Sequence, residues 1–150
     1  MNIRILLGAG DQILYVTLPV ALAAIILNII FPDFFGTGLG SAGTILGVGL
    51  LVLGVPVWFA AGILVLMNVP RGKLITTGPF ALVRHPIYTS VGLLVLPGFG
   101  FLLDSWIGLV IGLVLYFSSR IYSVKEDRML EEKFSEAYLD YRAKVRLPWL

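Results

Sequence analysis

The chain has 150 residues, of which 58% are hydrophobic and only 13% are charged, and its formal net charge at pH 7 is +2. A soluble domain of this length needs about 25% charged residues to cover its surface, so the composition excludes a soluble globular protein and favours an integral membrane protein. The absence of cysteine excludes disulfides and thiolate metal sites, and a single histidine argues against a conventional zinc site.

Apolar residues form three long runs along the chain, near residues 12–31, 41–68 and 87–119. Because a membrane-spanning helix needs about 20 apolar residues, each of the first two runs predicts one span. The third run is interrupted by Gly98, Gly100 and Asp104, which favours a hairpin of two shorter or tilted helices. The sequence therefore predicts an all-α integral membrane protein with about four transmembrane helices.

The basic residues predict the orientation of these spans. Every Lys and Arg lies in the N-terminal segment, in the 69–86 loop or in the segment from Arg120 onward, whereas the opposite loops contain only Asp33 and Asp104. Short loops on the cytoplasmic side of a membrane are enriched in Lys and Arg. With four spans, both termini and the 69–86 loop are therefore expected to be cytoplasmic.

Glycines are frequent in the apolar runs and often lie four residues apart. The pairs Gly36/Gly40, Gly43/Gly47 and Gly108/Gly112 have a spacing that lets helices approach closely. Such pairs serve packing within one chain more often than a dimer face, so a monomer is favoured. Pro56 and Pro97 are expected to kink their helices.

The loop before the third apolar run contains the sequence GPFALVRHPIYTS, which begins at Gly78. Pro86 suits the first turn of a helix, so Arg84 and His85 directly precede a helix N-terminus, where backbone N–H groups favour an anion. A carboxylate- or phosphate-binding site is one interpretation. The alternative is that both residues mark the cytoplasmic boundary of the membrane.

From Val124 onward the chain is densely charged, yet apolar side chains recur at helical spacing. This pattern predicts a C-terminal cytoplasmic amphipathic helix, with Glu126 and Asp127 at the membrane-proximal end of its apolar stripe. The two acids either decorate a helix N-terminus or bind a polar group at the membrane surface. The stripe comprises Leu130, Phe134, Ala137, Tyr138, Tyr141 and Val145, and Glu131, Glu132, Glu136 and Arg142 lie off it.

Taken together, the two segments resemble the membrane-embedded methyltransferases that include isoprenylcysteine carboxyl methyltransferases and phosphatidylethanolamine N-methyltransferases. The family pattern is G-P-[FY]-x-x-x-R-H-P-x-Y, a helical hairpin, then E-E-x-x-L-x-x-x-F-G-x-x-Y-x-x-Y-x-x-x-V and a proline. The resemblance covers residues 74–148 and departs from the pattern at Asp127, Ser135 and Ser90. It implies one membrane methyltransferase domain over 1–150, with spans in 12–68 and a cofactor-binding core in 69–150.

The resemblance implies S-adenosylmethionine as cofactor and a pocket for it near the cytoplasmic surface. A guanidinium and an imidazole can bind its carboxylate, acids its ammonium or ribose, and aromatic rings its adenine or sulfonium. The implied cofactor-binding residues are Gly78, Arg84, His85, Tyr88, Glu126, Asp127, Tyr138 and Tyr141.

The methyl acceptor is expected to be a lipid or a lipid-attached group, such as a prenylated cysteine carboxylate, an ethanolamine head group or a hydrophobic thiol, that enters from the bilayer. For an amine acceptor, Glu126 is the candidate base. For a carboxylate, an arginine must orient it, and the candidates are Arg120, Arg142 and Arg146. We expect membrane lipids but no nucleic acid as partners.

Two other functions fit parts of the sequence. Membrane sterol reductases contain a similar R-H-P-x-Y segment and bind NADPH, whose phosphates suit Arg84 and His85 equally well. A noncatalytic membrane protein that recruits a partner through its cytoplasmic helix is the second alternative. Binding of S-adenosylmethionine or of NADPH distinguishes the three.

Overall fold

A computed structural model describes residues 10–148, and this part of the chain is built from helices and the loops between them. One isolated bridge joins Gly36 and Ser105. In chain order the elements are α2 (Gly10–Ile30), α3 (Pro32–Phe35), α4 (Ser41–Asn68), the 3₁₀ turns η1 (Val69–Arg71) and η2 (Gly78–Ala81), α5 (Pro86–Ser90), the π-helix η3 (Val91–Val95), α6 (Leu96–Leu102), α7 (Ile107–Phe134) and α8 (Glu136–Lys144).

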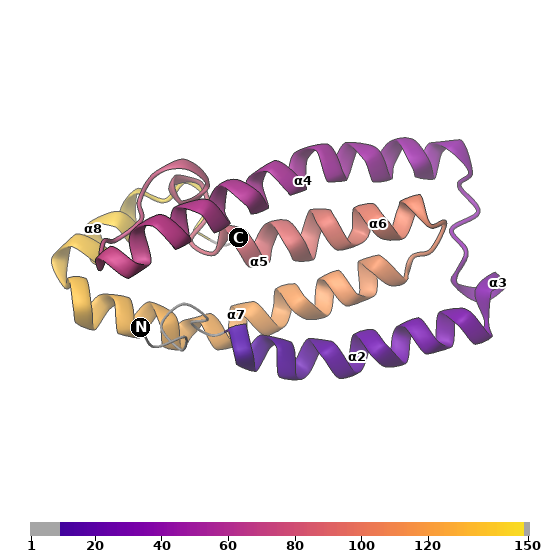
Figure 1. Cartoon of the computed structure of the whole chain (residues 1–150), viewed down its shortest axis with the longest axis horizontal. Coiled ribbons are helices and arrows are strands. Elements are labelled where there is room, and N and C mark those ends of the chain that lie inside the picture. The colour runs from indigo at the N-terminus through magenta and orange to yellow at the C-terminus, as the bar shows by residue number, and fades with distance from the viewer. Residues whose placement is uncertain (1–9, 149–150) are drawn as a thin grey trace.

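The long helical segments lie side by side as rods (Figure 1). α2 packs along α7, and α4 packs along the third rod, which α5, η3 and α6 form end to end. One end of the bundle holds α3 and the turn between α6 and α7, and the other holds α8 and the loop that contains η1 and η2. The sequence predicts that the basic segments share one side of the membrane. In the structure, the basic 69–86 loop and α8 lie at the same end of the bundle. Arg4 lies outside the described residues.

Within residues 10–148, three helical segments are long and apolar enough to cross a membrane, namely Gly10–Ile30, Ser41–Arg71 and Ile107–Phe134. The third rod, Pro86–Leu102, is apolar but shorter. The predicted hairpin is therefore present with arms of unequal length, and the count of four spans stays a prediction. The short arm contains η3, which ends two residues before Pro97, and a proline removes an N–H donor and crowds the preceding turn.

Glycines bring the rods together within the chain. A Cβ added at Gly47 would lie 2.8 Å from the Gly98 carbonyl oxygen, and one at Gly92 would lie 2.8 Å from that of Gly112. Gly47, Gly108 and Gly112 thus serve close packing within one chain as expected, whereas a Cβ at Gly43 would come no closer than 3.7 Å to the neighbouring α6. The pair Gly36/Gly40 was wrongly interpreted as helical, because both residues lie in the linker between α3 and α4.

The C-terminal segment differs from the prediction in two ways. α7 runs without a break from Ile107 to Phe134, so Glu126 and Asp127 lie inside a helix and not at its N-terminus. The predicted amphipathic helix is also not continuous, because Ser135 has a φ of 46° and separates α7 from α8. Its apolar residues still gather: Tyr138, Tyr141 and Val145 pack with Leu74, Phe80, Leu130 and Phe134.

Candidate functional site

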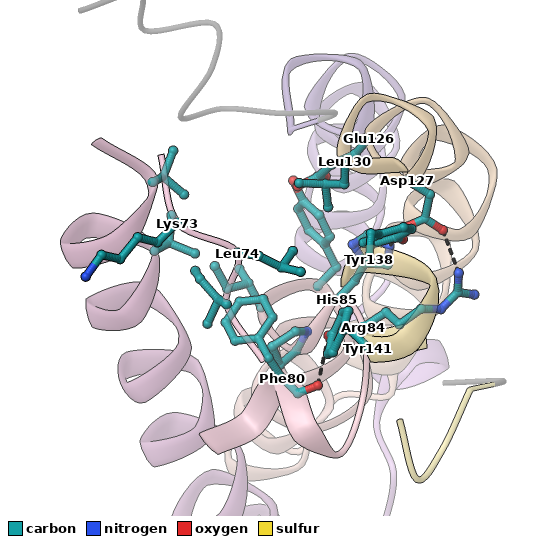
Figure 2. A pocket seen from close by; sticks show the side chains of 16 residues that line it. Lys73, Leu74, Phe80, Arg84, His85, Glu126, Asp127, Leu130, Tyr138 and Tyr141 are labelled. Carbon is teal, nitrogen blue, oxygen red and sulfur yellow. Dashed lines mark hydrogen bonds and ion pairs between the residues drawn. The ribbon is translucent and has the colours of Figure 1, made fainter. Parts of the chain in front are cut away.

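A pocket of about 120 Å³ lies at the α8 end of the bundle (Figure 2). Its walls come from the end of α4, the loop after it, α5, α7 and α8. One part of the lining is apolar and the other part is polar. The lining residues are Val65, Val69, Lys73, Leu74, Ile75, Phe80, Arg84, His85, Pro86, Ile87, Tyr88, Glu126, Asp127, Leu130, Tyr138 and Tyr141.

Local sequence places Arg84 and His85 beside the pocket. Gly78 adopts a φ of 62°, which favours glycine, and it starts the short turn η2 with Pro79 at its first positions. His85 then forms the N-cap of α5, with Pro86 following. The loop is thus bounded by a tight turn on one side and by a helix on the other.

Asp127 is the centre of the polar part of the pocket. Its carboxylate accepts a hydrogen bond from Arg84 Nη1 at 2.6 Å and one from Tyr138 Oη at 2.6 Å, and it lies 3.1 Å from His85 Nε2. The side chains of Arg84, His85 and Asp127 are only 8–16% exposed. Because a carboxylate with an adjacent guanidinium and several donors favours its charged form, Asp127 is an anion that neutralises Arg84 within the protein.

This arrangement differs from the simplest expectation, in which Arg84 and His85 both face a ligand anion. In the structure both face Asp127 instead. The Nε of Arg84 is buried and has no hydrogen-bond partner within residues 10–148, while the residue still lines the pocket.

Two tyrosines of α8 complete this wall. Tyr141 Oη donates to the Phe80 carbonyl oxygen at 2.9 Å. Burial raises the pKa of Tyr141 to about 12, and burial together with the hydrogen bond to Asp127 raises the pKa of Tyr138 above its ordinary value. Both hydroxyls therefore stay protonated at neutral pH and act as donors.

Seven of the residues that the resemblance implied line this pocket, although they come from three separate segments. They are Arg84, His85, Tyr88, Glu126, Asp127, Tyr138 and Tyr141. The Tyr88 ring centroid lies 6.4 Å from that of His85. Gly78 shapes the loop and is not among the lining residues.

The arginines proposed to orient an acceptor are not among the lining residues. Arg120 is partly buried on α7, whereas Arg146 is exposed and contributes its backbone N–H to a bond with Ala81. Arg142 is also exposed and lies 4.0 Å from Glu131.

The sequence interpretation assigned no site role to several lining residues. Val65 and Val69 belong to the end of a span, and Lys73 was counted only as a topological charge. Figure 2 shows the ammonium end of Lys73 directed away from the polar cluster. Phe80 was detectable, because it occupies the aromatic position of the G-P-[FY] motif.

A family described as phospholipid methyltransferase matches residues 16–137. This region includes most of α2, the rest of the bundle, the Arg84–His85 loop and the acids at 126 and 127, and it ends directly before Tyr138. No curated protein and no solved structure matches the chain.

Proposed function

Because this chain belongs to the phospholipid methyltransferase family, we propose that it transfers a methyl group from S-adenosylmethionine to a lipid-borne acceptor at the membrane surface. The family implies methyltransferase activity, and the three long apolar helices mark an integral membrane protein. The cofactor, the acceptor and the roles of individual residues belong to the proposal.

The single observation that supports it is the composition of the pocket. A polar cluster of Arg84, His85 and Asp127 faces the same cavity as an apolar wall that includes Val69 and Leu130. A zwitterionic cofactor needs the first kind of wall, and a lipid needs the second. The pocket lies where a spanning helix meets a charged loop, which suits an acceptor that enters from the bilayer.

The donor set fits S-adenosylmethionine. Arg84 and His85 would hold the carboxylate. Glu126 would accept hydrogen bonds from the ammonium or the ribose, and the rings of Tyr88 and Phe80 would contact the adenine or the sulfonium. The cofactor supplies an electrophilic methyl group when it is bound.

The chain itself contributes orientation, exclusion of water and transfer of a proton. Closely packed side chains fix the reacting groups and keep water out. Glu126 faces the pocket and is the base that removes a proton from an amine. Since Arg120 and Arg146 do not line the pocket, an amine acceptor has better support than a carboxylate.

Binding and transfer assays test the proposal. Purified protein in detergent is titrated with S-adenosylmethionine and, separately, with NADPH, and we expect binding of the first only. Arg84→Ala and His85→Ala should each weaken binding about tenfold, because each removes a charge-assisted or directed hydrogen bond in a poorly solvated site. Arg142→Ala, at an exposed pair, is the matched control and should bind normally.

The acceptor is identified with cofactor that has a labelled methyl group. Ethanolamine phospholipid, a prenylated cysteine and a hydrophobic thiol are offered in turn, and we expect transfer to the first. Binding of NADPH in place of S-adenosylmethionine would overturn the proposed function, and transfer to the prenylated cysteine alone would overturn the amine assignment.

A further inference from the structure

The chain does not end at α8 but returns along the loop that contains Arg84. Val145 is buried against Tyr138 and Tyr141 and has an extended backbone, and the next residues follow the loop. The Arg146 N–H donates to the Ala81 carbonyl oxygen at 3.3 Å, and the Leu147 N–H donates to that of Leu82 at 2.9 Å. We refer to residues 145–148 as the C-terminal strap.

Two side-chain bonds flank these backbone bonds. Tyr141 Oη donates to the Phe80 carbonyl oxygen at 2.9 Å, directly before the strap begins. Arg84 Nη2 donates to the Pro148 carbonyl oxygen at 3.4 Å at the other end. The loop is thereby held at positions 80, 81, 82 and 84, which are the residues that lead into the polar cluster.

We propose that the C-terminal strap is a positioning element for cofactor binding, which holds the 80–84 loop so that Arg84 and His85 present their polar groups to the pocket. This inference rests on the proposed function. The strap lies beyond the region that the family matches, which ends at residue 137. Its residues need not touch the cofactor, because they act through Arg84 and His85.

The physical reason is preorganisation. Between Gly78 and Pro86 the loop has only the short turn η2 as internal structure. Without the strap, the loop would sample several conformations, and binding would have to select the one in which Arg84 and His85 face the pocket. Fixing a binding loop in its bound conformation improves affinity because that ordering cost is already met.

A pair of substitutions at one strap position isolates the backbone bond. Leu147→Pro removes the N–H that donates to Leu82, whereas Leu147→Ala keeps it and is the matched control. We expect Leu147→Pro to weaken S-adenosylmethionine binding about fivefold relative to Leu147→Ala, which is the effect of one typical hydrogen bond. Because the same bond contributes to stability, the thermal unfolding midpoint of Leu147→Pro, measured without cofactor, should fall below that of Leu147→Ala by no more than the loss of one hydrogen bond.

A double-mutant cycle distinguishes positioning from a general loss of stability. In an Arg84→Ala, His85→Ala background, Leu147→Pro should have no further effect on the affinity for S-adenosylmethionine, since the groups that the strap positions are gone. An equal effect of Leu147→Pro in both backgrounds, or equal affinities of the Pro and Ala variants in the native background, would overturn the proposal.

A cofactor-free measurement separates this proposal from the proposed function. Hydrogen exchange of the Leu82 and Val83 amides, which donate to the Pro79 carbonyl oxygen within the loop, should be about fivefold faster in Leu147→Pro than in Leu147→Ala. Unchanged exchange would refute the strap whatever the protein binds. If exchange is faster in Leu147→Pro but the native protein does not bind S-adenosylmethionine, the proposed function and the role of the strap in cofactor binding are both refuted. The strap then only anchors the loop.

Discussion

Asp127 is the common hydrogen-bond partner of the polar side chains in the pocket. Arg84, His85 and Tyr138 all contact its carboxylate. A short side chain suits this task, because it loses little rotamer freedom when several donors fix it. The acid at the preceding position, Glu126, lines the same pocket and is the carboxylate better placed to act on a ligand.

Glu126→Gln should lower turnover with an amine acceptor at least about a hundredfold, because general acid–base groups contribute factors of this size. Glu131→Gln should stay within about twofold, since Glu131 is 46% exposed beside Arg142 and an exposed pair contributes little. Steady-state methyl transfer by the two variants gives the comparison. Equal losses would mean that Glu126 is not the base.

Two of the three departures from the family pattern are serines, and their surroundings in the structure differ. Ser90 is 1% exposed and its hydroxyl donates to the Pro86 carbonyl oxygen at 2.6 Å, so a small polar residue fits there. Ser135 has positive φ, where a side chain is strained. The second substitution is therefore less conservative than the residue type indicates.

At the scale of elements, the junction between α7 and α8 offers a stabilising change. Ser135→Gly should raise the free energy of unfolding by about 1 kcal/mol, because glycine adopts positive φ without steric cost. Ser135→Ala is the control and should not stabilise, since alanine retains the Cβ. Unfolding midpoints in detergent give the measurement, and equal midpoints for the Gly and Ala variants would contradict the strain.

The contact between the two hairpin arms leaves no room for a side chain. A Cβ at Gly112 would clash with the backbone carbonyl of Gly92, whereas one at Gly62 meets nothing within 4 Å. Gly112→Ala should therefore cost about 2 kcal/mol or more of stability, as overpacking does. Gly62→Ala should leave the unfolding midpoint unchanged or higher, and a similar loss in both variants would show that the rods do not meet at Gly112.

The elements differ in how far the sequence could specify them. The apolar runs at 12–31 and 41–68 nearly match α2 and α4, because the membrane fixes the length of such runs. The change from apolar to charged residues at Val124 does not coincide with the end of a helix. Such a change marks where the chain leaves the membrane for water, whereas the backbone hydrogen bonds of α7 continue to Phe134. The break at Ser135 was hidden because the apolar spacing continues through it.

The site shows a similar division. Motif order was enough to predict that Arg84, His85, Glu126 and Asp127 line one pocket. The pairing of Arg84 with Asp127 depends on how α7 is rotated about its axis relative to α5. That rotation cannot be predicted from a single sequence. The strap was equally hidden, because its backbone hydrogen bonds do not require particular side chains.

At the scale of the whole molecule, sidedness is directly testable because the chain contains no cysteine. A single cysteine at exposed Ala143 on α8 should react with a membrane-impermeant maleimide from the cytoplasmic side only, and one at exposed Asp33 from the opposite side only. A cysteine at buried Ala61 is the control and should react from neither side. Labelling of both exposed positions from one side would refute the predicted orientation.

The order in which the rods pack has a consequence for biosynthesis. α2 packs along α7 and α4 along η3 and α6, so each of the first two spans finds its main neighbour in chain that is made later. When synthesis has reached residue 70, the close-packing faces at Gly47 and Gly54 still contact lipid. Inserted helices associate after insertion, so a nascent chain halted before Ile107 can pack α4 against the third rod but lacks the partner of α2 and the walls of the pocket that α7 and α8 supply.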